Sequence, residues 1–330
     1  MAAFRSVEAS IREKRGYAKP MKKPTFVVAL TTDDNDYQME QAAAAENTAR
    51  RLDVNIQIVY ADNDAILQSQ QLLKIIQSTS MSHPDGIIFE PVGGTGLPQV
   101  AGAAAAAGIG WVVLNRDVEY LADLRKAYRV PLFAITSDHF EVGCIQGRQL
   151  AALVPNGGSI LCIQGPSESL ATQQRFAGMC ETKPANLQVR VIKANWTEAS
   201  AYKAVSSWLR LSTSQHGVCD AIACQDDSIA VGARKAFQEL ADSALRERWL
   251  GLPYLGCDGM PKTGQEWVKS GLLAATVVIP ANTGQALEML VNALKHGTMP
   301  PARTMTVPLS FPDLGALATS RAKKARAGSE

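Results

Sequence analysis

Apolar stretches about as long as a β-strand alternate along this chain with stretches of helical length and mixed polarity. In the first half the apolar runs are Thr25–Thr31, Val54–Tyr60, Gly86–Glu90, Gly110–Asn115 and Leu132–Thr136. The segments of helical length between them are Tyr37–Leu52, Asp64–Ser78 and Leu97–Ala107. Unbroken apolar strands that alternate with helices are typical of a parallel sheet covered by helices on both faces.

The second half of the chain repeats this alternation. Its apolar runs are Ser159–Ile163, Val189–Ile192, Asp220–Cys224, Tyr254–Cys257 and Ala274–Val278. Its segments of helical length are Phe140–Leu153, Ser169–Glu181, Ala199–Leu211, Ser228–Ala241, Pro261–Ser270 and Thr283–His296. A length of 330 residues suits about two domains. The pattern therefore predicts an α/β protein with two similar, doubly wound, parallel-sheet domains.

Polar residues gather where several of these predicted strands end. They are Thr31 to Tyr37, Asn115 to Asp117, Gln225 to Asp227, and Asp258. In open parallel sheets, ligands bind beyond the carboxyl ends of the strands. If the two domains face each other, these ends line one shared cleft, which is the usual setting of a small-molecule site.

The composition favours a folded protein, and the charge distribution argues against nucleic-acid binding. Hydrophobic residues make up 46% of the chain and charged residues 19%, which supports real cores and excludes extensive disorder. Seven basic and two acidic residues give residues 1–24 a net charge of +5, residues 321–330 carry +3, and the body between them is left at about −6. We expect basic tails, solvated or weakly attached to an anionic surface, on a mildly acidic body.

The candidate chemistry of the chain points to no catalytic or metal site. The six cysteines include no CxxC pair, so we expect free buried thiols and no clustered zinc site. There is no GxSxG motif, and the neighbouring carboxylates Asp33/Asp34 and Asp226/Asp227 would rarely face each other across a substrate. We therefore expect no catalysis, no cofactor and no metal.

Five stretches of the chain together resemble the type I periplasmic sugar-binding proteins, a family that includes the ribose-binding protein and shares its fold with the effector domain of LacI-type repressors. The stretches are VVALTTDDNDYQMEQ, GIGWVVLNRD, ITSDHFEVGCIQGRQLA, CDAIACQDDSIAVGARKAF and YLGCDGMPKTGQEWVKSGLLAATVV. Each is moderately specific alone, but their order and spacing match the family from about Thr25 to Phe311. The resemblance implies the periplasmic-binding-protein type I fold, in which a three-strand hinge joins the two domains.

The resemblance also implies how the chain is divided between these domains. The hinge crossings fall near Thr136–Asp138, Val278–Ala281 and Leu309–Phe311. A basic N-terminal extension covers residues 1–24, an N-terminal ligand-binding lobe comprises 25–136 plus 281–308, and a C-terminal lobe comprises 137–279 plus 310–330. The helix at Thr283–His296 would then return to the N-terminal lobe.

In the N-terminal lobe, the resemblance places ligand contacts on six positions. They are Thr31, Asn35, Tyr37, Gln38, Asn115 and Arg116. Arg116 can hold two neighbouring hydroxyls at once, unless it forms a salt bridge with Asp117 or Asp138. Two positions depart from the family, because Asn115 replaces an aspartate and Gln38 replaces an aromatic ring.

In the C-terminal lobe, the implied contacts are Gln173, Trp196, Asp226 and Asp258. Trp196 would cover a sugar ring opposite Tyr37, although ordinary packing would also explain it. Asp258 would accept a hydroxyl unless it caps the following helix, and Asp227 would cap the helix at Ser228 or brace the site. Gln173 falls where the family has a ligand-binding arginine, while a second, usually structural arginine falls on Arg175. A ribose-type arrangement is therefore not expected.

The resemblance implies the solute-binding protein of an ABC-type sugar transporter, which closes its hinge around a monosaccharide or a related polyol or cyclitol. The implied partners are that small molecule and an ABC permease, with no nucleic acid and with a monomeric protein. Two alternatives stay open, a ligand-sensing subunit and a LacI-type effector domain without its DNA-binding headpiece. The resemblance implies a periplasmic location. The N-terminus shows no apolar core of a secretory signal, which leaves the cytoplasm as the alternative.

Overall fold

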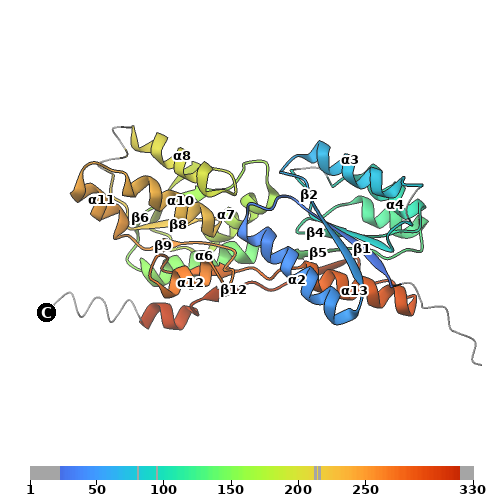
Figure 1. Cartoon of the computed structure of the whole chain (residues 1–330). Coiled ribbons are helices and arrows are strands. Elements are labelled where there is room, and N and C mark those ends of the chain that lie inside the picture. Colours follow the sequence, from blue (N-terminus) through green and yellow to red (C-terminus); the bar gives the residue numbers. More distant parts are fainter. Residues whose placement is uncertain (1–22, 80–81, 94–95, 212–213, 215–216, 320–330) are drawn as a thin grey trace, which may run out of the picture.

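The computed structural model describes residues 23–79, 82–93, 96–211, 214 and 217–319. Two parallel sheets lie toward opposite ends of an elongated molecule, each with helices on both faces (Figure 1). We call the part built on the first sheet the N-terminal lobe and the part built on the second the C-terminal lobe. The residue boundaries that we predict for the lobes stay a prediction.

The N-terminal lobe is built on six parallel strands. They are β1 (Thr25–Leu30), β2 (Asn55–Tyr60), β3 (Gly86–Phe89), β4 (Gly110–Leu114), β5 (Leu132–Ser137) and β11 (Arg303–Thr306). Their order in the sheet is β11-β5-β4-β3-β1-β2, and every neighbouring pair is parallel. All residues of β3, β4 and β5 are buried, which is why these strands are apolar without alternation.

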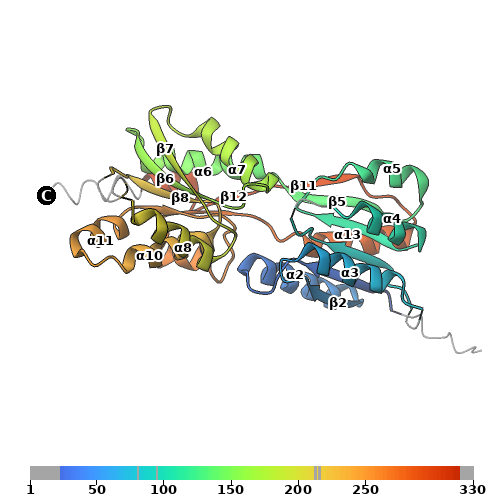
Figure 2. The same ribbon diagram turned by 90° about the horizontal axis from the view of Figure 1, so that it is seen from above.

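Helices cover both faces of this sheet. One face carries α2 (Asp36–Leu52) and α13 (Thr283–His296), which pack on β1, β3, β4 and β5. The other carries α3 (Ala65–Ile76), α4 (Pro98–Ala106) and α5 (Tyr120–Ala127). As predicted, α13 returns to this sheet, although it follows the C-terminal lobe in the sequence (Figure 2).

The C-terminal lobe is built on four parallel strands in the order β7-β6-β8-β9. They are β6 (Gly158–Gln164), β7 (Leu187–Lys193), β8 (Ala221–Cys224) and β9 (Tyr254–Leu255). One face packs against α6 (His139–Leu153) and α7 (Leu170–Thr182). The other packs against α8 (Glu198–Leu209), α10 (Asp227–Gln238), α11 (Ser243–Leu250) and α12 (Gly264–Lys269).

The chain crosses between the lobes at three places in the described residues. It leaves the first sheet between β5 and α6, returns between β10 (Thr276–Val278) and α13, and leaves again between β11 and β12 (Leu309–Phe311). β10 and β12 pair antiparallel beside the second sheet, where Asp258 bridges to Val278. Three adjacent crossings form a hinge about which the lobes can move.

The structure confirms the predicted fold class, and most predicted elements agree with it to within a few residues. The sequence analysis did not predict α5, α11, β11 or the helix at residues 314–319. α5 and α11 are eight-residue helices that each bury one side chain, Leu121 and Trp249, so they give almost no apolar periodicity. β11 lies at the edge of its sheet and has no buried residue. The predicted basic extension lies almost wholly outside the described residues.

Candidate ligand-binding site

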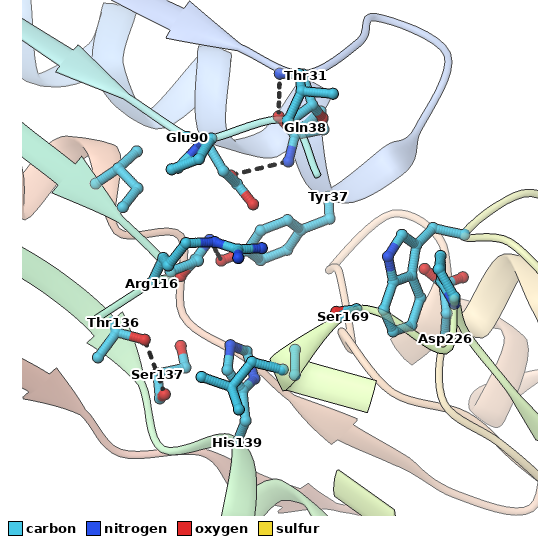
Figure 3. Close-up of a pocket in the computed structure, with 18 of the residues that line it drawn as sticks. Thr31, Tyr37, Gln38, Glu90, Arg116, Thr136, Ser137, His139, Ser169 and Asp226 are labelled. Atoms are coloured by element: carbon cyan, nitrogen blue, oxygen red, sulfur yellow. Dashed lines mark hydrogen bonds between the residues drawn. The ribbon is translucent and has the colours of Figure 1, made fainter. Parts of the chain in front are cut away.

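A cavity of about 440 Å³ lies between the two lobes and is lined by residues of both. Sites for small organic ligands typically enclose about 300–1,000 Å³. In Figure 3, Thr31, Gln38, Glu90 and Arg116 lie on one side of the cavity, and Ser169 and Asp226 lie on the other. His139 comes from the segment that joins the lobes. The cavity is therefore placed where the carboxyl ends of the strands meet.

Gln38 and Glu90 form part of the N-terminal wall. Gln38 Oε1 accepts a hydrogen bond from the Thr31 N–H (3.1 Å), and its Nε2 donates to Glu90 Oε2 (2.9 Å). Glu90 follows β3 directly, and its backbone carbonyl accepts from Gln68 Nε2 (2.8 Å). Burial raises the pKa of Glu90, against the opposing hydrogen bond from Gln38. Gln38 thus orients a carboxyl group in the cavity wall.

Tyr37 and Asn115 belong to a network that ties the N-terminal lobe to the hinge. The Tyr37 hydroxyl accepts from Gln41 Nε2 (3.0 Å) and Asn115 Nδ2 (3.0 Å), and donates to the Pro280 carbonyl (3.4 Å). Asn115 Oδ1 accepts from Asn282 Nδ2 (2.7 Å). Both amide ends of Asn115 are therefore engaged, while the Tyr37 ring packs in an apolar cluster with residues of α6 and β10.

Arg116 is a half-buried guanidinium in the same wall. Its pKa is lowered by burial, and the charge of Glu90 opposes that effect. Asp117, which the sequence analysis considered as a salt-bridge partner of Arg116, pairs with Arg303 instead (2.9 Å). Asp138 caps α6 by accepting from the Glu141 N–H (2.9 Å). The position of Arg116 in the lining suits it to hold ligand hydroxyls.

The C-terminal wall is built around Trp196 and Arg175. The Arg175 guanidinium carbon lies 5.4 Å from the centre of the Trp196 ring, and its Nη2 lies 3.6 Å from Asp258 Oδ1. Arg175 also donates to the Gln225 carbonyl. A Cβ on Gly165 would lie 2.3 Å from the Trp196 ring, so only glycine lets the indole rest on that strand end. Trp196 thus presents a supported aromatic face to the cavity.

Three buried aspartates complete this wall, of which Asp226 and Asp258 line the cavity and Asp227 lies behind them. Asp226 caps α10 by accepting from the N–H groups of Ser228 (2.6 Å) and Ile229 (3.2 Å). Asp227 accepts from the Gly259 N–H (2.7 Å) and the Thr276 hydroxyl (2.7 Å), which fixes the loop that carries Asp258. The sequence analysis expected Asp227 either to cap the helix at Ser228 or to brace the site. In the structure Asp226 caps that helix, and Asp227 braces the site. Burial raises the pKa of all three aspartates; the charge of Asp258 adds to this effect on Asp226 and Asp227, whereas Arg175 and the contact with Asp226 oppose it on Asp258.

Asn35 makes a direct contact between the lobes. Its Oδ1 accepts from the N–H groups of Tyr37 (2.9 Å) and Gln38 (3.2 Å), which caps α2. Its Nδ2 donates to the Trp196 carbonyl (3.1 Å) in the other lobe. One side chain therefore begins a helix and also bridges the mouth of the cavity.

His139 lines the cavity at the start of α6. Burial lowers its pKa to about 3, helped by the charges of Arg175 and Arg116, against a smaller contribution from the Asn115 backbone. The imidazole is therefore neutral at physiological pH. Both ring nitrogens are buried without a well-formed hydrogen bond to a described residue.

Nine of the ten predicted site residues line the cavity: Thr31, Asn35, Tyr37, Gln38, Asn115, Arg116, Trp196, Asp226 and Asp258. Gln173 does not line it. Its side chain is exposed and donates to the Ser167 carbonyl (3.0 Å). Residues two apart lie on nearly opposite faces of a helix, and α7 turns Arg175 toward the cavity instead.

Sequence reasoning missed Glu90, Arg175 and His139 as parts of the lining. Glu90 could have been found, because it is the polar residue at the end of an apolar run, the same signal that identified Asn115 and Asp258. Arg175 had been assigned a structural role, and its contacts with Asp258 and Trp196 show that it also shapes the wall. No sequence signal marked His139, whose burial depends on contacts at the hinge.

No other chemistry is evident in the described residues. They contain no group of three or more His, Cys, Asp or Glu side chains placed to bind a metal ion. Within the same residues, no helix is long and apolar enough to cross a membrane. The six cysteines are free thiols, of which Cys180 is exposed and the others are buried.

Comparison with solved structures shows the same fold in several sugar-bound proteins. A periplasmic solute-binding protein from Actinobacillus succinogenes with bound D-allose superposes with a TM-score of 0.74 at 19% identity, covering 90% of this chain and 100% of the other. A solute-binding protein from Bacillus halodurans with bound myo-inositol gives a TM-score of 0.68 at 21% identity, covering 91% and 98%.

Sequence comparison agrees with these structures. The D-allose-binding periplasmic protein of Escherichia coli is 25% identical over 283 residues, which cover 84% of this chain and 86% of the relative. The ribose import binding protein of Salmonella typhimurium is 23% identical over 280 residues, which cover 84% and 87%. The family model described as periplasmic binding protein domain matches residues 26–298. The chain therefore belongs to the periplasmic binding protein family.

Proposed function

We propose that this chain is the solute-binding protein of an ABC-type transporter and binds a monosaccharide, polyol or cyclitol between its lobes. The observation that carries the proposal is the cavity itself, which joins hydroxyl-binding groups of both lobes with an aromatic face. Relatives named for D-allose and ribose, and the structure with bound myo-inositol, support this class of ligand. In this proposal the protein works as a monomer in the periplasm and delivers its ligand to an ABC permease.

The proposed mechanism is ligand binding coupled to closure of the hinge. Arg116 on the N-terminal lobe and Trp196 and Asp258 on the C-terminal lobe would contact the ligand at the same time. A ligand stabilises the closed form only through contacts that exist in that form. Contacts with both lobes therefore make closure dependent on the ligand, and no bond in the ligand needs to change.

A thermal-shift screen with D-allose, D-ribose and myo-inositol tests the proposal. A ligand at a hundredfold excess over its dissociation constant stabilises the folded protein by about 2.7 kcal/mol. Arg116→Gln should abolish the shift that a ligand produces, whereas the control Arg50→Gln, on the exposed surface of α2, should retain it. Absence of a shift with all three compounds and with related sugars and cyclitols would contradict the proposed function.

A further inference from the structure

The cavity lining includes three carboxyl groups and two guanidinium groups, of which those of Glu90 and Arg116 are half-buried and the other three are buried. They are Glu90, Asp226 and Asp258, and Arg116 and Arg175. Burial raises the pKa of Glu90 and the charge of Arg116 lowers it, while Arg175 Nη2 lies 3.6 Å from Asp258 Oδ1. Each guanidinium therefore has one carboxylate as its main opposite charge, and one carboxyl group is left over.

The other carboxyl groups of the lining bring no unpaired positive charge to the cavity. They are Asp117, which pairs with Arg303, Asp138, which caps α6, and Glu168, which is exposed. His139 is buried and neutral, so it adds no positive charge.

Of the two fully buried carboxyl groups of the lining, Asp258 is paired with Arg175 and Asp226 has no ion pair with a described residue. The charges that act on it are those of Asp258 and Asp227, both negative, and together with burial they raise its pKa. Asp226 Oδ1 is engaged with the first N–H groups of α10, and the carboxyl group is also hydrogen-bonded to Asp258. Two carboxyl groups can share such a contact only if one of them holds a proton.

The cavity also contains polar atoms that the protein leaves unpaired. Arg175 Nε is buried without a hydrogen-bond partner among the described residues, and neither nitrogen of the His139 ring makes a well-formed hydrogen bond there. Buried polar groups are normally paired, so these atoms indicate a ligand with several polar groups. A neutral imidazole has one donor and one acceptor, which suits a hydroxyl group.

We propose that the ligand of this cavity is a sugar, polyol or cyclitol that carries one protonated amine, and that its ammonium group binds Asp226. The inference rests on the proposed function and specifies its ligand. On binding, Asp226 releases its proton to solvent and the ammonium takes its place, donating to Asp226 and Asp258. Charge is conserved, because one cation enters the site as one proton leaves it. The third ammonium N–H can donate to a hydroxyl group of the same ligand or to water.

Matched pairs of probes test this inference by isothermal titration calorimetry. The pairs are D-glucosamine with D-glucose, D-allosamine with D-allose, and an aminodeoxy-inositol with myo-inositol; N-acetyl-D-glucosamine keeps the nitrogen without its charge. A hydrogen bond to a charged group contributes about 1.5–3 kcal/mol, so the amine of the best pair should bind about 10- to 100-fold more tightly than its hydroxyl partner. Titrations in buffers of different ionisation enthalpy should show release of a proton. Affinity should rise with pH as long as Asp226 is protonated in the free protein and the amine of the probe is protonated in solution.

A matched pair of variants separates the charge of Asp226 from its role as a helix cap. Asp226→Asn keeps a good cap and removes the charge, so it should lose the preference for the amine. Asp64→Asn is the control, because Asp64 caps α3 through the same pattern of N–H contacts (2.7 and 3.1 Å) and does not line the cavity. This control should keep the preference.

The possible results distinguish this inference from the proposed function. If the neutral member of the best pair binds as tightly as the amine, or if Asp226→Asn leaves the ratio unchanged, the inference is overturned and the proposed function stands. If neither member of any pair binds, the inference is overturned; if D-ribose and related sugars and cyclitols do not bind either, the proposed function fails with it.

Discussion

The hydrogen bond from Asn35 to the Trp196 carbonyl allows the closure of the lobes to be tested separately from folding. Asn35 Oδ1 caps α2, while Nδ2 reaches the other lobe at 3.1 Å. Serine is as good an N-cap as asparagine, but its shorter side chain has no donor that reaches across the cleft. Asn35→Ser should therefore keep the helix and lose the contact between the lobes.

The expected changes in ligand affinity and in the free energy of unfolding follow from the one hydrogen bond that Asn35→Ser removes. One hydrogen bond contributes a net 0.5–1.5 kcal/mol, and this bond joins the two lobes across the cavity. Ligand affinity should therefore fall by roughly two- to twelvefold, with about fivefold as the central value. The free energy of unfolding should change by only about 0.5 kcal/mol or less, because the cap is retained.

Calorimetric titration with the tightest ligand of the screen, together with urea unfolding, measures both quantities. Asn35→Ala is the matched comparison, since it removes the cap as well and should cost a further 0.5–2 kcal/mol or so of stability. Wild-type affinity in Asn35→Ser would refute the role given to this contact. Equal stability of the two variants would refute the separation of the two roles.

Three further predictions concern packing and titration. In Gly143→Ala, the new Cβ would lie 2.0 Å from a backbone carbonyl oxygen of α7, so urea unfolding should show that the free energy of unfolding falls by about 1–3 kcal/mol. The control is Gly102→Ala in α4, where a new Cβ would have no atom within 4 Å and the free energy of unfolding should stay the same or rise. In Gly165→Ala, the methyl group would displace the Trp196 ring, and calorimetry should show ligand affinity reduced about tenfold. The pKa of His139 falls from 6.5 in the unfolded chain to about 3 in the folded protein. As the pH drops between these values, the unfolded chain binds a proton at His139 and the folded protein does not, so the free energy of unfolding declines. His139→Gln should therefore reduce the acid sensitivity of unfolding between neutral pH and about pH 4.5, and an unchanged pH dependence would contradict this.

Much of the fold could be predicted because the buried strands and helices give strong local patterns. Strands such as β4 are apolar throughout because both of their faces are covered, and the polar residues that follow them lie at the cavity. The helix at Thr283–His296 was predicted with its observed bounds. Short elements with a single buried side chain, such as α5, carry too little apolar surface for the same reasoning.

The details of the site depend on contacts that no local pattern records. Asn115 is engaged by Asn282, which lies 167 residues away in the sequence. The choice between Gln173 and Arg175 depends on the rotation of α7 about its axis, which a sequence match does not specify. His139 is neutral mainly because it is buried at the start of α6, next to the hinge. These are tertiary properties, and each of them alters which groups a ligand would meet.

Small-angle X-ray scattering with and without the tightest ligand of the screen tests the central claim most directly, because that claim requires one molecule to bind both lobes and close the hinge. A saturating ligand should lower the radius of gyration and shorten the largest interatomic distances. The Arg116→Gln variant at the same ligand concentration should scatter like the free protein. If the ligand binds the wild-type protein and the scattering curve does not change, the proposed closure is wrong.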